Sequence, residues 1–463
     1  MQLAAETGLY VYGMLSAIGA EEDSIHFTNN EEGEEWTGIH FYQPEEEYNF
    51  EYCTIRNAYN GLVTRWHIYL NVIHCDINCT YIAFGTLDPN ENDHVGNRYH
   101  FEDSIIIGSR ITTLSRSSVI GINCYFNTGG YDDESWGFTN LGSVVLTDCD
   151  FYGTLGGTLS GAYRNCNIYS PNELPVNVYI VGGGALIQDC YVEGRVEVIN
   201  NRTDIVGNEI SGKLNIQSYT GLISDNVIGK MKIRYNSGPI SITNCIIDEN
   251  VAIYDGPEVE MYDCYLLGNV DPWINTLYLI GLDIRETPVH FIHHNLILGR
   301  VGFAGDYLDV VVANNTIIAE SLDDPLFATT LQEGTIQITN NVMICEGEND
   351  GLYYPMLEPG LNAIIKYNLM HGFDQFLFSG PLVEDAELDE SNLFDVNPLL
   401  VSLDPLDPRP MPDSPCVDAG DPDSPLDPDS TRADIGMFYY HHAVSVPDSS
   451  IVELYVVRIF WTH

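Results

Sequence analysis

Apolar and polar positions recur along this chain at a fixed interval, most regularly between Leu186 and Leu266. One short phrase returns there as LIQDCYVEG, IVGNEISG, LISDNVIG, SITNCIID and EMYDCYLLG. The Cys or Asn near the centre of each phrase is its anchor, and the anchors, which lie 18 or 19 residues apart, are Cys190, Asn208, Asn226, Cys245 and Cys264. A large apolar residue stands three positions before each anchor and another two positions after it. A period of about 20 residues in short β-rich segments is the signature of a coiled β-solenoid.

The two apolar columns continue in both directions from this stretch. Further anchors are Cys53, Cys75, Ser104, Cys124, Cys149, Cys166, Asn295, Asn315, Asn341 and Asn368. The residue two after the anchor is apolar at all of them, and three before it the one exception is Gly121. The pattern therefore predicts an all-β solenoid of about fifteen or more coils, in which short strands flank each anchor and stack on those of the neighbouring coils.

The anchor is predicted to mark a corner between two strands. Asn suits such a corner because it tolerates left-handed backbone angles and its amide bonds to neighbouring backbone groups. Stacked about every 4.8 Å, inward Asn side chains form a hydrogen-bonded ladder, and a Cys at the same place is a small buried filler. Eight of the eleven cysteines are anchors. Their spacing is that of the repeat and not of a metal motif, so we expect free buried thiols.

This repeat resembles that of the right-handed parallel β-helix family with the pectate-lyase-like fold, over residues 10–380. The resemblance implies a right-handed parallel β-helix, and it implies no particular activity, because this fold carries many unrelated sites among its polysaccharide lyases and hydrolases. The chain's opening is similar to the middle of the family's entry module through Leu15, Ala17, Gly19, Ile25, Phe27, Thr28, Trp36, Gly38, Ile39 and Phe41. We therefore expect a chain that is truncated at its N-terminus, with its signal peptide and cap missing.

The expected organisation has four parts. Residues 1–50 form the first coils, and residues 51–380 form the main β-helix. Residues 381–440 are rich in Pro and Asp and are similar to the family's closing segment, which wraps the last coil. The matching residues there are Ser414, Pro415, Asp418, Ala419, Gly420, Asp434 and Gly436. Residues 441–463 have a strand-like apolar pattern and no assigned role.

The chain is strongly acidic, with 67 acidic against 18 basic residues and a net charge of −49. This balance argues against nucleic acids and anionic membranes as partners, because both require a basic surface. No apolar run is long enough to span a bilayer. The charge suits a secreted or cell-surface protein and the binding of divalent cations; a merely solvated acidic surface is the alternative.

Scarce cations gather on the regular coils, and they are the first candidate site. A second strand begins after each anchor phrase, as GRVEV, GKLNI and GKMKIR, which places Arg195, Lys213 and Lys230 in one column. Alternation puts Glu197, Asn215 and Lys232 in the next outward column, with Arg234 beyond. Stacking like charges costs energy. We assign catalysis to Lys213, Lys230 and Arg195 and substrate binding to Lys232, Arg234 and Arg300; local pairing with Glu193, Glu197 and Glu209 is the alternative.

Two further clusters carry metal-binding residue types. Oxygen ligands at alternate positions suit Ca²⁺, and the segment DPDSPLDPDS supplies Asp421, Asp423, Asp427 and Asp429. The EF-hand pattern is absent there, so a Pro-stiffened acidic turn is the alternative. The segment VHFIHHN holds His290, His293 and His294, a set suited to zinc or to acid–base chemistry. His294, however, directly precedes an anchor, where other coils carry a turn-forming Asp or Asn.

Two functions follow from these features. The first is an extracellular or cell-surface module that binds polysaccharide in an adhesin-like or structural role. The second is a polysaccharide lyase that acts on an acidic glycan through the Lys and Arg face, since β-elimination needs a base beside a uronate whose carboxylate is neutralised. The paired-Asp and Arg-Pro-Arg signatures of known β-helix enzymes are not found in the chain. The oligomeric state and the sugar are not indicated by the sequence.

Overall fold

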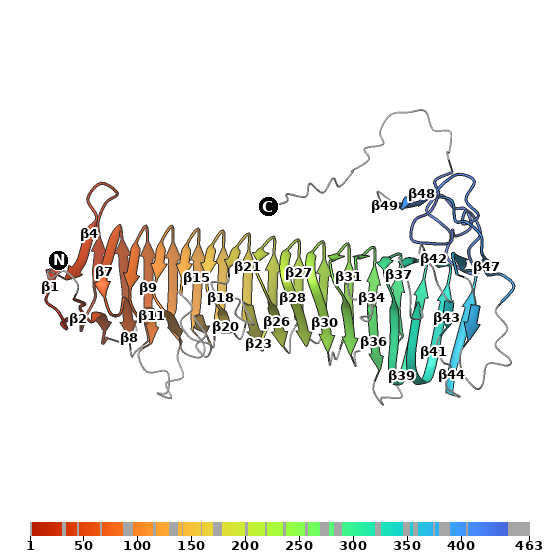
Figure 1. The fold of residues 1–463 in the computed structure, drawn as a ribbon. Coiled ribbons are helices and arrows are strands. Elements are labelled where there is room, and N and C mark those ends of the chain that lie inside the picture. The colour runs from red at the N-terminus through yellow and green to blue at the C-terminus, as the bar shows by residue number, and fades with distance from the viewer. Residues whose placement is uncertain are drawn as a thin grey trace.

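The computed structural model shows an elongated stack of β-coils (Figure 1). It describes residues 2–29, 34–43, 46–64, 67–86, 96–113, 117–128, 138–140, 142–158, 160–169, 178–199, 202–217, 220–234, 238–254, 258–268, 277–281, 289–319, 326–345, 352–354, 360–373, 376–378, 389–403 and 406–442. Within these ranges the chain forms strands and no helix, and the strands pair in parallel with those of the neighbouring coils. The predicted all-β parallel β-helix is confirmed. Residues 443–463 of the predicted tail lie outside the described part.

Each coil contributes up to three strands, so that three parallel sheets run along the stack. Sheet I holds the strands that precede the anchors. They are β3 (Ser16–Ile18), β6 (Glu46–Glu51), β9 (Ile68–Ile73), β12 (Arg98–Glu102), β15 (Ser118–Ile122), β18 (Ser143–Thr147), β21 (Ser160–Arg164), β24 (Ala185–Gln188), β27 (Arg202–Val206), β29 (Thr220–Ser224), β31 (Ile240–Thr243), β34 (Val259–Tyr262), β37 (His290–His293), the later residues of β39 (Val301–Ala313) and β41 (Phe327–Thr339), and β44 (Gly360–Lys366).

Sheet II holds the strands that follow the anchors. They are β1 (Gln2–Leu3), β4 (Ile25–Asn29), β7 (Cys53–Ala58), β10 (Asp76–Cys79), β13 (Ile105–Ile107), β16 (Tyr125–Asn127), β19 (Asp150–Tyr152), β22 (Asn167–Tyr169), β25 (Tyr191–Val192), the first residues of β28 (Glu209–Gln217) and β30 (Val227–Arg234), β32 (Ile246–Ile247), β35 (Tyr265–Leu266), β38 (Leu296–Leu298), β40 (Thr316–Ala319), β42 (Val342–Cys345), β45 (Leu369–His371) and β47 (Leu393–Phe394). These strands are short because the corner follows closely.

Sheet III closes each coil. Its strands are β2 (Gly8–Val11), β5 (Gly38–Phe41), β8 (Leu62–Thr64), β11 (Ile82–Thr86), β14 (Arg110–Thr113), β17 (Phe138–Asn140), β20 (Leu155–Thr158), β23 (Val178–Val181), β26 (Val196–Ile199), the later residues of β28 and β30, β33 (Val251–Tyr254), β36 (Leu277–Gly281) and the first residues of β39 and β41. Two small sheets lie apart from it. β43 (Leu352–Tyr354) pairs in parallel with β46 (Phe376–Phe378), and β48 (Leu400–Leu403) pairs in antiparallel fashion with β49 (Leu406–Pro410).

The left-handed corner falls one residue before the anchor, and not at the anchor as we expected. Asp189, Asp225 and His294 have φ values of 53°, 58° and 54°, and each directly precedes an anchor. The anchor side chain points into the coil instead, and Asn295 is fully buried. Two adjacent residues thus have different roles. The corner needs a residue that tolerates positive φ, whereas the buried anchor position needs one whose side chain hydrogen-bonds to backbone groups.

The predicted asparagine ladder is present and extends one coil further than the sequence indicated. The backbone N and the Nδ2 of Asn295 both donate to Oδ1 of Asn315, over 2.9 and 3.0 Å. The same pair of bonds joins Asn315 to Asn341, Asn341 to Asn368, and Asn368 to Asn392. Each amide thereby satisfies buried backbone groups that a parallel stack would otherwise leave unpaired at the corner.

Cysteine takes the anchor position through much of the N-terminal half. Each anchor thiol donates to the carbonyl two residues earlier, for example Cys149 Sγ to Thr147 O over 3.2 Å and Cys166 Sγ to Arg164 O over 3.1 Å. All eleven cysteines are buried and free, as we expected. Burial raises the pKa of the Cys79 thiol to about 12, so this thiol is uncharged at neutral pH and fills space in the core.

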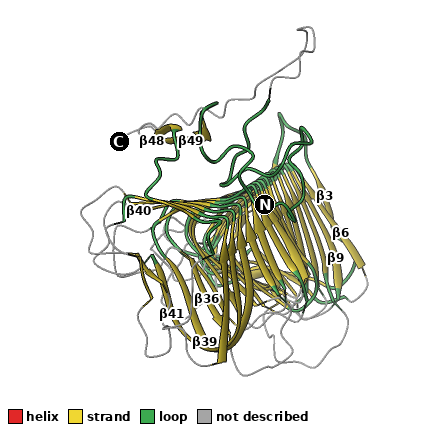
Figure 2. Ribbon diagram, turned by 90° about the vertical axis from the view of Figure 1, so that its right-hand side faces the viewer, coloured by secondary structure: helices red, strands yellow, loops and turns green. Residues whose placement is uncertain are grey.

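The C-terminal segment, residues 395–403 and 406–442, folds back over the last coils, and we call it the strap (Figures 1 and 2). Its Cys416, Ile435 and Met437 are buried against outward side chains of sheet II, which are Leu296, Ile318, Val342, Ile344 and Leu369. Gly436 N donates to Asn340 O over 2.8 Å, and Met437 N donates to Thr316 Oγ1 over 3.1 Å. The strap therefore covers an apolar outer face that would otherwise lie in water.

We predict that Asn315→Ala destabilises the solenoid. The Asn315 amide donates to the carbonyls of Ile292 and Ala313 and to Asn341, and its Oδ1 accepts from Asn295. Its loss leaves several buried groups unpaired, at a cost of about 1–3 kcal/mol each. Urea unfolding followed by circular dichroism should show a lower midpoint.

The matched control is Asn167→Ala. Asn167 is exposed on sheet II and donates to Asp150 Oδ1 over 2.8 Å. Because water replaces this bond, its loss should cost no more than about 0.5 kcal/mol. Equal losses in the two variants would contradict the role given to the ladder.

Candidate functional site: a cationic face on sheet III

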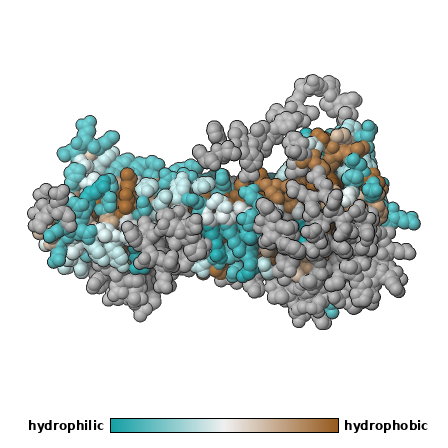
Figure 3. All heavy atoms as spheres, viewed as in Figure 1, coloured by the Kyte–Doolittle hydropathy of each residue, from teal (hydrophilic) through white to brown (hydrophobic). Residues whose placement is uncertain are grey.

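The predicted cation columns are present on sheet III. Lys213 lies beside Lys230 in the pairing of β28 with β30. Glu197 lies beside Asn215, and Asn215 lies beside Lys232, across β26, β28 and β30. Figure 3 shows hydrophilic side chains gathered near the middle of the solenoid, over the part where these strands run. We call Arg195, Lys213, Lys230, Lys232 and Arg234 the cationic face.

Alternation along the strands explains why these cations share one face. Leu214 and Ile216 on β28 are buried, as are Met231 and Ile233 on β30. Side chains of a strand point to opposite faces in turn, so the residues between them point outward. The apolar columns of the core thus fix the position of the outward cations.

Two of the cations have carboxylate partners. Arg195 Nη2 lies 2.7 Å from Glu197 Oε2, and Asn215 Nδ2 donates to Glu197 Oε1 over 3.0 Å. Lys230 Nζ lies 3.3 Å from Glu249 Oε2. Local pairing therefore accounts for Arg195 and Lys230, and Glu197 was a partner that the sequence suggested. The partner of Lys230 is Glu249, which the sequence analysis did not name.

Two others lie over an aromatic ring. Lys232 Nζ is 4.6 Å and Arg234 Cζ is 5.0 Å from the centroid of the Tyr254 ring. Arg234 pairs with Tyr254 in register across β30 and β33, which brings the ring under both cations. Cation–π contacts of this kind hold the cations in place while their charge remains available to a ligand.

Lys213 lies at the centre of the cationic face. Burial lowers its pKa below the ordinary value, and neighbouring positive charges lower it further, in the order Lys232, Arg195, Lys230 and Arg234. Among the described residues Lys213 has no carboxylate within ion-pair distance. A partly buried ammonium group among other cations is electrostatically unfavourable, and it releases its proton more readily than an ordinary lysine.

Arg300 is less accessible than the substrate-binding role requires. It directly precedes Val301, which pairs with Leu277, and Leu277 pairs with Val251. This places Arg300 in the column of Arg195, Lys213 and Lys230, further along the solenoid. Its exposed fraction is 7%. The structure therefore brings five of the six predicted residues to one surface and keeps Arg300 buried away from it.

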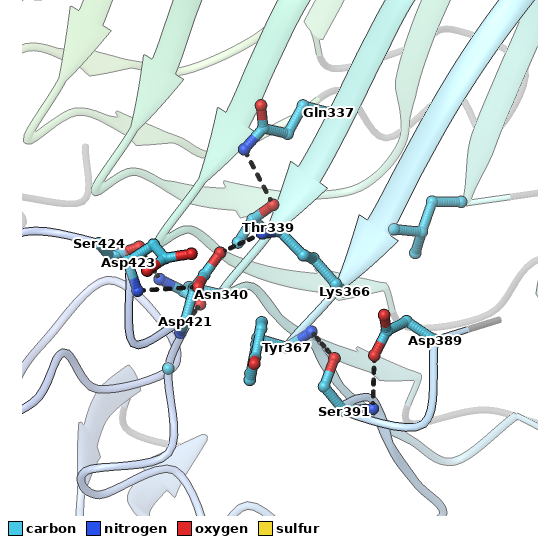
Figure 4. Close-up of polar contacts among 12 residues, drawn as sticks. Gln337, Thr339, Asn340, Lys366, Tyr367, Asp389, Ser391, Asp421, Asp423 and Ser424 are labelled. Carbon is cyan, nitrogen blue, oxygen red and sulfur yellow. Dashed lines mark hydrogen bonds and ion pairs between the residues drawn. The ribbon is translucent and has the colours of Figure 1, made fainter.

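The four aspartates of the proposed calcium segment do not converge. Asp421 Oδ2 lies 2.5 Å from Lys366 Nζ, and Asp421 Oδ1 accepts from Asp423 N over 3.0 Å. Figure 4 shows how Asn340 joins the strap beside this ion pair, accepting from Asp421 N over 2.7 Å and donating to Ser424 Oγ over 3.1 Å. Asp421 thus fastens the strap to the coils.

Asp427 and Asp429 also hold the strap together. Asp427 Oδ2 accepts from Asp434 N over 3.0 Å, and Asp429 accepts from Thr431 and from His442 N. Within the described ranges no three His, Cys, Asp or Glu side chains come together as a metal site. Calcium binding gains no support from this geometry and stays a prediction.

The three histidines face different surroundings. His290 is buried, its Nδ1 accepts from Val259 N over 3.3 Å, and burial lowers its pKa to about 4. His293 stacks on Tyr262 with ring centroids 5.3 Å apart, and His294 takes the left-handed corner. Because His290 points into the core, the structure favours the corner interpretation of His294 over a zinc site.

Comparison with known proteins places the chain in no named group. It matches no protein-family model and no curated protein sequence. In the part of the chain that the structure describes, no helix is long and apolar enough to cross a membrane. The class of protein is therefore defined by its architecture, an all-β parallel β-solenoid with a strap over its last coils.

Two features of the site were missed from the sequence. Tyr254 was not singled out, although the repeat alone would have aligned it with Arg234. The isolation of Lys213 from carboxylates depends on side-chain directions, for which the sequence pattern carries no signal. Both features concern contacts between coils and not positions within one coil.

We predict that Lys232→Met raises the pKa of Lys213, because Lys232 is the strongest of the neighbouring charges that lower it. Lys213, Lys230, Lys232 and Lys366 are the chain's four lysines, so reductive ¹³C-methylation gives few signals to assign. Their pH titration by NMR measures the shift. Arg202→Met is the control, since Arg202 lies on sheet I; an unchanged Lys213 pKa in Lys232→Met would contradict the arrangement.

We predict that Asp427→Asn stabilises the protein at neutral pH. Burial and the charge of Asp434 raise the Asp427 pKa to about 6, above its ordinary value of 3.8. A raised pKa means that the protonated group stabilises the folded state below about pH 4, and that this stability is lost as pH rises through about 6. The variant cannot ionise, so its thermal midpoint should exceed the parent's at about pH 7.5 and match it at about pH 4.

We predict that Asp429→Asn has the opposite effect on stability at neutral pH. A hydrogen bond from Thr431 lowers the Asp429 pKa, so ionised Asp429 stabilises the fold above its ordinary pKa. This variant should lower the midpoint at neutral pH and have little effect in acid. The same sign for both variants would show that general charge reduction, and not local geometry, controls the stability of the strap.

Proposed function

We propose that this protein engages an acidic polysaccharide through its cationic face, as an extracellular or cell-surface binding module. The observation that carries the proposal is the central group of Lys213, Lys232 and Arg234. Among the described residues these three make no ion pair with a carboxylate, in a chain of net charge −49. Cations that are concentrated and not neutralised suit an anionic ligand.

The form of the surface supports a polymeric ligand. Sheet III presents outward residues on successive coils about 4.8 Å apart. Lys213 and Lys230 lie on adjacent strands, and Lys232 and Arg234 extend the charge along one strand. A row of cations with an aromatic ring at its edge can meet successive carboxylate or sulfate groups and the apolar face of a sugar.

A second candidate is a polysaccharide lyase, and the lowered pKa of Lys213 favours it. At a given pH more of this amine is neutral and able to accept a proton than for an ordinary lysine. In β-elimination Nζ would take the proton from the carbon beside the uronate carboxylate, and the glycosidic oxygen would leave from the next carbon. Nearby Lys232 and Arg234 would neutralise the carboxylate meanwhile.

We predict that Lys213→Ala weakens binding to acidic polysaccharides about tenfold, because it removes the central cation. A panel of acidic and neutral polysaccharides, assayed by affinity electrophoresis at low and high salt and with calcium or a chelator, measures this. Arg202→Ala is the matched control, since Arg202 is an exposed cation on sheet I. If both variants bind as the parent does, the cationic face is not the binding surface.

The same panel separates binding from lysis. A lyase produces an absorbance from unsaturated uronates together with new reducing ends. Lys213→Arg should then abolish turnover while retaining binding, because a guanidinium keeps the charge and cannot act as a base near neutral pH. If the parent binds an acidic polysaccharide without cleaving it, the function is that of a binding module and not of a lyase.

A further inference from the structure

A cavity of about 480 Å³ lies between the strap and the corners of the solenoid. The corner residues of three consecutive coils line it, and they are Asp263, His294 and Asn314. The strap lines it with a Pro-rich stretch around Asp427 and with an aromatic stretch around Tyr439. It occupies the edge where sheet I meets sheet II, so it is separate from the cationic face on sheet III.

The strap is fixed to the coils toward one end of the cavity, at the corners of Asn314 and Asn340. Asn314 Nδ2 donates to the backbone carbonyl of Asp434 over 3.2 Å, and Asn340 bonds to Asp421 N and to Ser424. The strap is thereby fixed to two corners, while Asp263 and His294 at the preceding corners face the remaining space. A cavity built by two fixed elements requires little rearrangement to admit a ligand.

The lining combines flat apolar surfaces with hydrogen-bonding groups. Pro425, Pro428, Phe438 and Tyr439 supply the apolar part. Asp427 uses only one carboxylate oxygen for the bond from Asp434 N, which leaves Oδ1 as an acceptor. A compact ligand with hydroxyl groups around an apolar ring matches such a lining.

The charges of the lining decide between classes of sugar. Burial raises the pKa of both Asp427 and Asp434, the charge of Asp434 raises that of Asp427 further, and the charge of Asp418 does the same for Asp434, so an added negative charge would be opposed. The Arg409 guanidinium does not offset this, because it forms two bonds to Asp407, over 2.8 and 2.7 Å. A uronate is therefore disfavoured here, whereas an uncharged hydroxyl can donate to Oδ1 of Asp427.

We infer that this cavity binds one uncharged sugar residue, with its ring against Tyr439 and its hydroxyl groups toward Asp427 and Asp263. The protein then carries two sites of different preference, one on sheet III for an acidic glycan and one under the strap for a neutral sugar.

The test uses the full chain with methyl glycosides of glucose, galactose, mannose and N-acetylglucosamine as probes, and with methyl galacturonoside and butylammonium as counter-probes. Saturation-transfer NMR detects binding, and calorimetry measures it. We expect at least one neutral glycoside to bind, Asp427→Asn and Tyr439→Ala each to weaken it about tenfold, and both counter-probes to bind less well.

Tyr10→Ala is the matched control, because Tyr10 is exposed at the opposite end of the solenoid. Asp427→Asn keeps an oxygen that can accept from Asp434 N, so it should fold, and circular dichroism verifies this. The inference is overturned if no neutral glycoside binds, if methyl galacturonoside or butylammonium binds as tightly, or if both cavity variants bind as Tyr10→Ala does.

Discussion

The in-register stacking of each coil on the next is the constraint on which the rest of this structure depends. A parallel stack places equivalent residues of neighbouring coils side by side. The hydrogen-bonding, packing and charge of each side chain therefore depend on the equivalent side chain in the next coil. The buried amides of Asn295, Asn315 and Asn341 satisfy this condition, since each donates to the amide of the next coil. Asn315 and Asn341 also accept from the amide of the coil before, and Asn295 accepts from the backbone N of Cys264. Apolar columns satisfy it by packing.

Charged columns meet the same constraint less easily, and the cationic face shows how. Lys213 and Lys230 are neighbours because the register requires it. The carboxylate of Glu249 offsets the repulsion on Lys230, and the ring of Tyr254 offsets it on Lys232. Among the described residues Lys213 has neither a carboxylate nor an aromatic ring as such a partner. The electrostatic strain that stacking creates is thus concentrated on one residue, and a ligand with negative charge would relieve it.

The fold and the position of the cationic columns could be predicted from the sequence, because both follow from the repeat period of the anchors. It misplaced the left-handed corner by one residue, since an Asn suits both the corner and the buried position beside it and the pattern does not say which. It also missed the ion pair of Lys366 with Asp421 and the continuation of the ladder to Asn392. Those contacts join the repeat to non-repeating segments, where no period exists to align them.

The distribution of Asn and Cys along the anchor column determines which neighbouring coils share side-chain hydrogen bonds at their corners. Coils anchored by Asn are joined by directional amide bonds, whereas the thiols of Cys245 and Cys264 reach the preceding coil only through longer contacts, of 3.6 and 3.7 Å, to backbone carbonyls. Asn208 and Asn226 form an isolated amide pair between Cys190 and Cys245, and they belong to the two coils that carry Lys213 and Lys230. The coils beneath the cationic face are therefore joined at their buried corner by amide hydrogen bonds, in addition to the backbone pairing that all neighbouring coils share.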